Sequence, residues 1–465
     1  MLKKIMKNDL VKSGGAYTIA TFALKGVNFF TIPLFTHILT VEQYGFVNNF
    51  AAWVSVFSIF IGLNLNAAIN NAIIDFKDKI KNFLSSVLLL ATLVFAIVVV
   101  GSLVGLNLIS SSVNRVFLLF VLLQSFVTFV INFQSTYLMI QNKYLQNILV
   151  SFLSTIFNVF FSVTFMLTIF SLNPDWGRVI GSTVGLVLLA IPLYLNILLK
   201  GGLNINFKYW KFALVISVPL LPHAVGNFVL SQFDRIIIQQ YRGDVEVGLY
   251  SFVYNVATII SVIWMAANNA WVPWFFKKFS EDKKGEITKT TTLFISLFMI
   301  VTMIVMPISV DLARYMGTDS YQAGIFLIMP VTLAYFFQFL YGFPVNAEFV
   351  LKKTGFIGIS TAVAAVINVV INLWLVPKFG YVAAGFSTLF TYLILMVGHF
   401  FMAKKLLGYQ LFKGIRFTIA GITMTVYSAI QMLVVGQTYS RYMVMIGGIF
   451  IVLLYSYNMI RRYKE

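Results

Sequence analysis

Long apolar runs dominate the pattern of hydrophobic and polar positions along this chain. About 20 residues at roughly 1.5 Å rise per residue cross the hydrocarbon core of a bilayer, so each run of about this length predicts a membrane-spanning helix. Fourteen such runs occur, and they cover residues 16–39, 44–65, 83–106, 116–140, 148–172, 179–199, 212–240, 247–276, 293–312, 325–345, 356–376, 382–402, 417–435 and 443–460. The pattern therefore predicts an all-α integral membrane protein with about 14 transmembrane helices.

The seventh and eighth apolar runs are longer than one membrane crossing requires. Such a segment adapts by tilting, by kinking or by lying partly in the membrane interface. Pro219 and Pro222 fall within the seventh run. We expect them to kink its helix, because proline interrupts the helical hydrogen bonds.

Short motifs between the apolar runs recur about 203 to 210 residues apart. The matched pairs are 174–183 (PDWGRVIGST) with 377–388 (PKFGYVAAGFST), 133–163 with 343–373, and the segment from Tyr44 with the segment from Val247. The second pair places Asn158 opposite Asn368. Three ordered matches indicate two related halves, as in many transporters. We therefore predict a six-helix lobe over 1–200, a pseudo-symmetric six-helix lobe over 201–405 and a terminal two-helix hairpin over 406–465.

The net charge of +18 follows the predicted topology rather than marking a nucleic-acid surface. When the N-terminus is placed in the cytoplasm, 25 of the 33 lysines and arginines fall in inner segments, 7 fall in outer segments, and Lys25 lies inside the first run. This bias predicts that both termini are cytoplasmic. It also implies contact with anionic membrane lipids and no nucleic-acid partner.

Groups for catalysis or metal binding are sparse in this sequence. Cysteine is absent, which excludes disulfides and thiolate metal sites. His37, His223 and His399 lie far apart and have no neighbouring ligand residues at metal spacing. Most of the 15 carboxylates fall in predicted loops. The sequence therefore predicts a protein that is not an enzyme and that has no catalytic residues or cofactor.

Polar residues inside apolar runs are costly in lipid, so they are candidates for function or for helix pairing. Lys25 lies nine residues into the first run, about 14 Å by helical rise and so near the midplane. We favour a hydrated cavity in which Lys25 receives an anion, while the alternative is a buried cation paired with a carbonyl or amide. For the hydroxyls and amides the alternative is hydrogen bonding between helices. The candidate cavity residues are Thr21, Lys25, Asn28, Asn66, Asn70, Gln124 and Asn255.

A second candidate site follows from depth along the helices. Asp234, Asn368, Asn372 and Thr388 all lie about 7 to 14 Å below the outer ends of the seventh, eleventh and twelfth runs. A carboxylate, two amides and a hydroxyl offer the oxygen ligands that suit a hard monovalent cation or a proton. The sequence therefore predicts a site for a coupling ion, either Na⁺ or H⁺, with Asp234 as the candidate sodium ligand.

The alternative for this second site is structural. Asp234 would then pair with Arg235 or Arg242 near the interface, and the asparagines would join helices. The first half lacks the acid, and there Asn158 and Ser162 correspond to Asn368 and Asn372.

Four motifs carry a family resemblance: IPLFTHILTVEQYG from Ile32, SVPLLPHAVGNFVLSQFDR from Ser217, EVGLYSFVYN from Glu246 and VPKFGYVAAGFST from Val376. In their order and spacing the chain resembles the Wzx-type polysaccharide and O-antigen flippases of the multidrug, oligosaccharidyl-lipid and polysaccharide exporter superfamily. The motifs and the repeat cover most of the first twelve runs. The count of fourteen resembles the lipid II flippases.

The resemblance implies a flippase for undecaprenyl-pyrophosphate-linked oligosaccharide repeat units in the bacterial cytoplasmic (inner) membrane. The product would enter O-antigen, capsule or exopolysaccharide assembly, with polysaccharide polymerase and chain-length proteins as implied partners. Lipid II flippases place sodium on the seventh, eleventh and twelfth spans, which by similarity implies Asp234, Asn368, Asn372 and Thr388. The chain departs from its relatives after Gly62, where an arginine is often found and this sequence has asparagines.

Two other functions compete with the flippase interpretation. A multidrug or toxin extruder of the same superfamily prefers cationic amphipaths and would need an acidic cavity rather than Lys25. A membrane glycan polymerase or ligase would need a sizeable outer loop with catalytic Arg, His or Glu, and the predicted outer loops are short.

Overall fold

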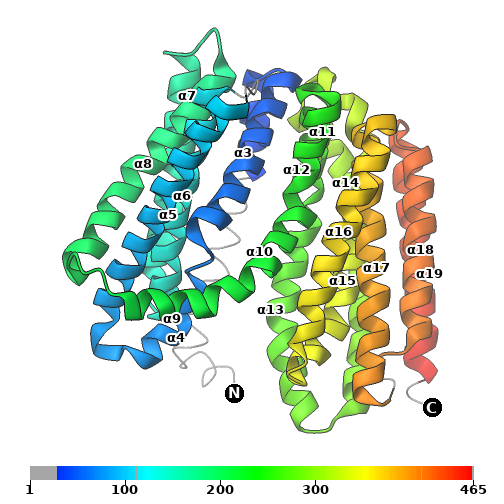
Figure 1. Cartoon of the computed structure of the whole chain (residues 1–465). Helices are drawn as coiled ribbons and strands as arrows, with labels where there is room; N and C mark the ends of the chain where they lie inside the picture. The colour runs from blue at the N-terminus through cyan, green and yellow to red at the C-terminus, as the bar shows by residue number, and fades with distance from the viewer. Residues whose placement is uncertain (1–28, 110–113, 410, 463–465) are drawn as a thin grey trace. The chain divides into compact units, whose positions relative to one another are not determined.

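The structure is a computed structural model that describes residues 29–109, 114–409 and 411–462 (Figure 1). The described residues form helices and no strands. Twelve straight or broken helices among them are long and apolar enough to cross a membrane. The prediction of an all-α, multi-pass membrane protein is therefore confirmed. The first predicted span lies mostly outside the described residues, which include its final segment as the short helix Phe29–Ile38.

The described helices belong to two compact units. Unit 1 contains Phe46–Gln232, and unit 2 contains Ile32–Gly45 together with the residues from Phe233 onward. The predicted division into 1–200, 201–405 and 406–465 follows the sequence repeat and stays a prediction.

Unit 1 is built around α8, which packs against α5, α6 and α7. Its helices are α3 (Val41–Gly62, which begins in unit 2), α4 (Ala67–Asp75), α5 (Ile80–Ile109), α6 (Arg115–Ile140), α7 (Tyr144–Leu167), α8 (Pro174–Gly201), α9 (Phe207–Ser217) and α10 (Leu221–Phe228), with a 3-10 turn at Lys77–Lys79. Close packing of α7 on α8 depends on small residues, because a Cβ at Gly181 would lie 2.5 Å from the Phe161 carbonyl oxygen.

Helix α9 runs across the ends of the unit 1 helices (Figure 1). The indole Nε1 of Trp210 donates to the Ser86 carbonyl over 2.7 Å, which anchors α9 to the first turns of α5. The amide of Asn82 donates to the Gly201 carbonyl over 3.0 Å and fixes the end of α8 to the same turns. These contacts gather the starts of α5 and α9 and the end of α8 at one end of unit 1.

The seventh apolar run forms a broken helix, as its prolines predict. After α9, a 3-10 turn at Val218–Leu220 contains Pro219, and α10 then begins at Leu221. A π-helical turn at Val229–Phe233 precedes α11 (Asp234–Arg242). The eighth run is also interrupted, at Thr258 between α12 and α13. The expected break of the seventh run is confirmed, and the eighth run adapts by a break, one of the three adaptations that its length allows.

Unit 2 is built around α15, where 83% of the most apolar stretch is buried. Its helices are α11, α12 (Asp244–Ala257), α13 (Ile259–Ser280), α14 (Lys284–Met316), a 3-10 segment (Asp319–Leu327), α15 (Ile328–Val350), α16 (Thr354–Phe379), α17 (Tyr381–Leu407), α18 (Gly414–Leu433) and α19 (Thr438–Arg462). The α18–α19 hairpin packs against α14 and α15. Arg441 of α19, which is fully buried, binds Asp311 of α14 over 2.6 Å and thereby attaches the hairpin.

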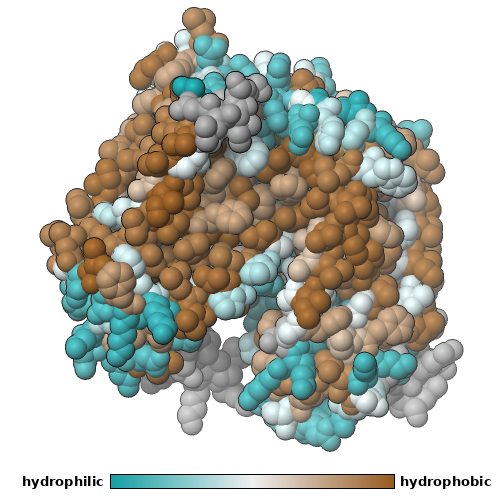
Figure 2. Space-filling view, in the orientation of Figure 1, coloured by the Kyte–Doolittle hydropathy of each residue, from teal (hydrophilic) through white to brown (hydrophobic). Residues whose placement is uncertain are grey.

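Exposed apolar side chains cover the flanks of the helices. Ile97 and Val100 of α5 are each about 60% exposed, as are Val366 and Trp374 of α16. Figure 2 shows such hydrophobic side chains on the visible face, with hydrophilic side chains toward the helix ends. Lipid is the solvent that such flanks require.

Candidate functional site

The hairpin of α16 and α17 is held in place by the start of α12. The turn residue Gly380 has φ of +62°, a conformation that glycine adopts readily, and a Cβ there would lie 2.1 Å from Oε2 of Glu246. The same Oε2 accepts a hydrogen bond of 2.8 Å from the backbone N–H of Tyr381, the first residue of α17. A carboxylate at a helix N-terminus is stabilised by the helix dipole. Glu246 therefore fixes the level at which α17 begins.

Arg242 fixes the end of α11 against the same hairpin. Its Nη2 donates to the Lys378 carbonyl over 2.8 Å and its Nε to the Val376 carbonyl over 3.3 Å. Cations at a helix C-terminus satisfy carbonyls that have no partner within the helix. The guanidinium also lies 3.9 Å from Glu246. The ends of α11, α16 and α17 are therefore joined at one level.

Asp234, in the first turn of α11, accepts hydrogen bonds from three helices. Its Oδ2 accepts from the Tyr250 hydroxyl of α12 over 2.6 Å and from the Thr388 hydroxyl of α17 over 3.0 Å. Its Oδ1 accepts from the Asn372 amide of α16 over 2.7 Å. Asp234 is 1% exposed. A buried carboxylate needs such donors, because burying a charge without partners is very costly.

A second set of polar groups surrounds Asn372. The same amide lies 3.1 Å from Oδ1 of Asn368, and the Ser387 hydroxyl donates to Oδ1 of Asn372 over 2.7 Å. The Asn368 amide is 3.4 Å from the Thr391 hydroxyl. All of these side chains are buried. We call the set of Asp234, Tyr250, Asn368, Asn372, Ser387, Thr388 and Thr391 the Asp234 cluster.

Arg235 places a second buried charge beside the Asp234 cluster. Its Nε donates to the Ser251 hydroxyl over 3.1 Å, and its guanidinium carbon lies 4.9 Å from the centre of the Tyr254 ring. The side chain is 3% exposed. A guanidinium over an aromatic face is stabilised by the ring quadrupole. The adjacent acid and base keep the net charge of this buried region close to zero.

The chemistry of the Asp234 cluster fits a proton or a monovalent cation. Its members offer carboxylate, amide and hydroxyl oxygens, the ligands of hard cations. Rotation of the Asn372 amide would exchange its N–H₂ for its oxygen and so change a donor to Asp234 into a ligand. Across the described ranges, no group of three or more His, Cys, Asp and Glu side chains could hold a metal ion. The single carboxylate of the cluster therefore favours a monovalent charge.

The structure brings together the four residues of the predicted coupling site, from α11, α16 and α17. Their role in ion binding stays a prediction. Sequence analysis missed Tyr250, Ser387 and Thr391. Ser387 could have been found, because it adjoins Thr388 in the repeated motif, whereas Tyr250 depends on the rotation of α12, which apolar periodicity does not fix in lipid.

The structure does not gather the described members of the predicted cavity set into one site. Thr21, Lys25 and Asn28 lie outside the described residues. Asn66 and Asn70 lie near the start of α4, where Asn70 is exposed and Oδ1 of Asn66 is buried with no hydrogen-bond partner among the described residues. Gln124 is in unit 1 and Asn255 is in unit 2.

Gln124 and Asn255 both join helices. Oε1 of Gln124 on α6 accepts from the Thr183 hydroxyl of α8 over 2.6 Å. The amide of Asn255 donates to the Tyr44 hydroxyl over 3.0 Å within unit 2. These contacts match the alternative of interhelical hydrogen bonding, and a role of either residue in binding substrate stays a prediction.

A buried chain of polar groups crosses α15, α16 and α17. Nδ1 of His399 lies 2.9 Å from Oε1 of Glu348, and its Nε2 lies 3.0 Å from the Ser360 hydroxyl. His399 and Glu348 are at most 1% exposed. Sequence analysis missed the pair because the predicted tenth span ends at residue 345, whereas α15 continues to Val350.

Comparisons with known proteins extend these observations. A model of the family described as polysaccharide biosynthesis protein matches residues 10–279. A protein of Haemophilus influenzae described as an uncharacterized membrane protein is 26% identical over 280 residues, which cover 59% of this chain and 67% of that protein. The Lsg locus putative protein 1 of the same organism is 22% identical over 288 residues, 60% of this chain and 68% of that protein.

Solved structures share the fold. The lipid II flippase MurJ, in an inward closed conformation, has a TM-score of 0.69 and 17% identity, with 97% of this chain and 100% of that chain covered. An outward-facing multidrug resistance MATE family transporter has a TM-score of 0.56 and 12% identity, with 86% and 95% covered. A transporter from Pyrococcus furiosus has a TM-score of 0.57 and 12% identity, with 85% and 95% covered. The chain therefore shares its fold with the lipid II flippase and with these two transporters.

Proposed function

This chain belongs to the polysaccharide biosynthesis protein family, and from that premise we propose that it is a flippase for undecaprenyl-pyrophosphate-linked oligosaccharide repeat units. It would move them across the bacterial cytoplasmic membrane for assembly of a surface polysaccharide. One combined observation carries the proposal: the chain matches this family, and its fold resembles that of a lipid II flippase over 97% of the chain. The bias of lysines and arginines supports an orientation with both termini in the cytoplasm.

The physical task of a flippase is to shield a sugar headgroup from hydrocarbon. Each hydroxyl moved into an apolar medium without a hydrogen-bond partner costs about 2 to 7 kcal/mol, so an oligosaccharide needs a hydrated route. The lipid tail needs no such route and can stay in the bilayer. Lys25 stays our predicted contact for the pyrophosphate, because charge-assisted hydrogen bonds to phosphate are strong.

The Asp234 cluster would couple this movement to an ion gradient. Asp234 and Thr388 would hold a sodium ion or a proton, with the Asn368 and Asn372 oxygens completing the set. The bound cation would supply positive charge that neutralises Asp234 and replaces hydrogen bonds from its present donors. An ion that binds one conformational state more tightly than another shifts the population toward that state. A tenfold preference corresponds to about 1.4 kcal/mol, which one charge-assisted contact can provide.

Reconstituted transport tests the proposal. The full chain in liposomes would receive a fluorescent oligosaccharide on undecaprenyl pyrophosphate, and a membrane-impermeant quencher would report movement between leaflets. Protein-free liposomes and liposomes holding the Asp282→Asn variant, which alters an exposed loop carboxylate, serve as controls. We expect protein-dependent movement that the control variant retains.

The same liposomes separate the flippase from a multidrug extruder. The likeness to a multidrug resistance transporter makes ethidium, a cationic dye, the appropriate probe. Export of ethidium without movement of the lipid-linked oligosaccharide would contradict the flippase proposal. A block in surface polysaccharide export in cells that lack the protein would support it.

A further inference from the structure

We propose that unit 1 contains a binding pocket for the phosphate group of an anionic phospholipid. The pocket, called here the basic pocket, has a volume of about 180 Å³. Its polar lining consists of Lys81, Gln134, Tyr137, Lys143, Gln146, Asn196 and Lys200. It lies within unit 1, apart from the Asp234 cluster of unit 2, and so its occupancy does not depend on the proposed flippase function.

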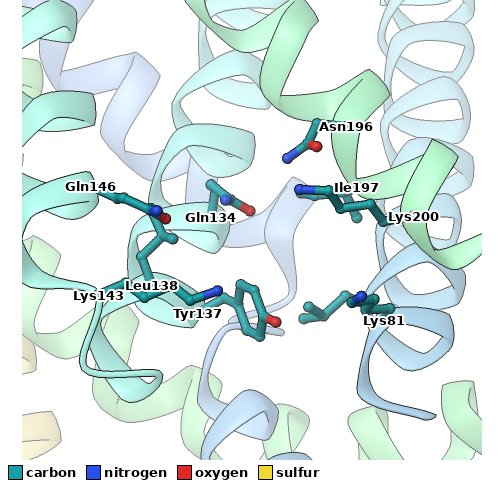
Figure 3. Close-up of a pocket in the computed structure, with 10 residues that line it drawn as sticks. Lys81, Gln134, Tyr137, Leu138, Lys143, Gln146, Asn196, Ile197 and Lys200 are labelled. Carbon is teal, nitrogen blue, oxygen red and sulfur yellow. The ribbon is translucent and has the colours of Figure 1, made fainter. Parts of the chain in front are cut away.

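Four segments of the chain contribute the lining. Lys81 is in the first turn of α5, Lys143 precedes α7, and Lys200 is in the last turn of α8. Figure 3 shows the side chains of Lys143 and Lys200 extending from opposite sides toward the middle of the pocket, with Gln134 and Tyr137 between them. The volume is several times the roughly 30 Å³ that one water molecule occupies in the liquid, so the pocket admits a phosphate group.

The basic pocket has three positively charged lysines and no negatively charged side chain to balance them. No carboxylate is among the lining residues. Within the described ranges, none of the eight ion pairs involves Lys81, Lys143 or Lys200. Three ammonium groups around one space repel each other, and an anion between them removes that repulsion. Each ammonium group can also donate a charge-assisted hydrogen bond to a phosphate oxygen.

Gln134 distinguishes the basic pocket from an ordinary lysine-rich membrane surface. Its side chain on α6 is 7% exposed, and its amide makes no hydrogen bond to any described residue. The amide lines the pocket and is accessible from it, so it can donate a hydrogen bond to a phosphate oxygen held among the lysines. Positive-inside bias places lysines at helix ends, but it gives no reason for a largely buried glutamine whose amide opens onto the space among them.

Exposed leucines beside the pocket favour a lipid over a soluble phosphate. Leu145 and Leu149 of α7 are 80% and 54% exposed, and Leu195 and Leu199 of α8 are 49% and 84% exposed. Each of these leucines is a sequence neighbour of a lining residue (Gln146, Asn196 or Lys200) or lies within one helical turn of it. Acyl chains on these leucines would place a headgroup at the pocket, whereas a free phosphate would have to enter it from the aqueous phase.

Lipid binding by a triple variant tests the assignment. Lys81→Gln, Lys143→Gln and Lys200→Gln would be combined in the full chain, which would be delipidated in detergent and titrated with dioleoyl phosphatidylglycerol under native mass spectrometry. The matched control combines Lys77→Gln, Lys79→Gln and Lys208→Gln, three exposed lysines of the same unit, so that both variants have a net charge of +15 in place of +18. Equal melting temperatures would show that both variants are folded.

We expect the triple variant to bind phosphatidylglycerol about a hundredfold more weakly than the wild type, and the control to change less than about threefold. Gln134→Leu, which keeps all three charges, should weaken binding about fivefold. Dioleoyl phosphatidylcholine, whose choline is cationic, should bind weakly to all variants. Equal losses in the triple variant and its control would overturn the proposal, because general surface charge would then explain binding.

Inorganic pyrophosphate separates the two sources of a phosphate group. We expect it to compete with phosphatidylglycerol only at much higher concentration. If the triple variant loses pyrophosphate binding and still binds phosphatidylglycerol like its control, the pocket serves a soluble anion and the lipid assignment is wrong.

Discussion

The two units contain related copies of the sequence repeat, yet the repeated asparagines bind side chains of opposite charge in the two units. In unit 1, Nη1 of Arg178 donates to Oδ1 of Asn158 over 2.8 Å and also to the Ser162 hydroxyl. In unit 2, the corresponding Asn368 and Asn372 belong to the Asp234 cluster, where Asn372 donates to the carboxylate. Unit 1 therefore supplies a cation of its own to these positions, and unit 2 supplies an anion.

This difference separates a permanent contact from an exchangeable one. The guanidinium of Arg178 is attached to α8 and stays charged at any physiological pH, so the unit 1 positions cannot respond to an ion gradient. Under the proposed function, Asp234 would accept a proton or a cation from outside the chain. The repeated threonines show the same contrast, since Thr183 donates to the neutral Gln124 and Thr388 donates to Asp234. The repeat-related positions therefore form a structural contact in unit 1 and the proposed coupling site in unit 2.

The largest expected effect is on Asp234. Asp234→Asn keeps the size of the side chain but removes its charge, so we expect reconstituted flipping to lose its dependence on a sodium or proton gradient. The rate under a gradient should fall about 10- to 100-fold, as for loss of one charge-assisted contact. Asp282→Asn, in an exposed loop, is the matched control. An Asp234→Asn variant with the wild-type ion dependence and rate would leave Asp234 a structural partner only.

Arg178 should matter to stability rather than to coupling. Arg178→Met keeps much of the packing volume and removes the donors to Asn158 and Ser162. We expect the free energy of unfolding to fall by about 2 kcal/mol, because these polar groups on α7 lose a charged partner. Thermal unfolding in detergent measures this. The ion dependence of flipping should be unchanged, and a changed dependence would show that both repeat sites participate in coupling.

Much of the fold could be predicted because a bilayer fixes the length of a helix. The apolar runs correspond to observed helices from α3 onward, and Pro219 correctly marks a break. The coupling candidates came together because residues at equal depth on helices that share one end lie at one level. The rotation of each helix is set by packing, which explains why Tyr250 was missed.

The basic pocket shows what apolar runs cannot reveal. Lys81, Lys143 and Lys200 are separated by 62 and 57 residues, and each alone matches the positive-inside bias. The apolar pattern also ended the tenth predicted span at residue 345, whereas α15 continues to Val350. Glu348 interrupts the apolar pattern, although inside the fold His399 pairs with its Oε1.

Strengthening the unit 2 site should sharpen the contrast between the units. Asn372→Asp places a second carboxylate beside Asp234, and two like charges at this distance favour a bound cation or a shared proton. We expect about a tenfold lower sodium or proton concentration for half-maximal flipping. The repeat-related Ser162→Asp in unit 1 would pair with Arg178 and should leave that concentration unchanged. A raised concentration in Asn372→Asp would contradict cation binding at the Asp234 cluster.

The smallest expected effects come from the paired threonines. Thr388→Val and Thr183→Val each remove one hydroxyl at nearly constant volume, so each loses a hydrogen bond with a net value of about 1 kcal/mol. In Thr388→Val the lost donor faces Asp234, and we expect about a fivefold change in the ion concentration for half-maximal flipping. In Thr183→Val the lost donor faces Gln124, and only the melting temperature should fall. Equal changes in ion dependence from both variants would mean that coupling is spread over the two units, and that the charge difference between Arg178 and Asp234 does not separate their roles.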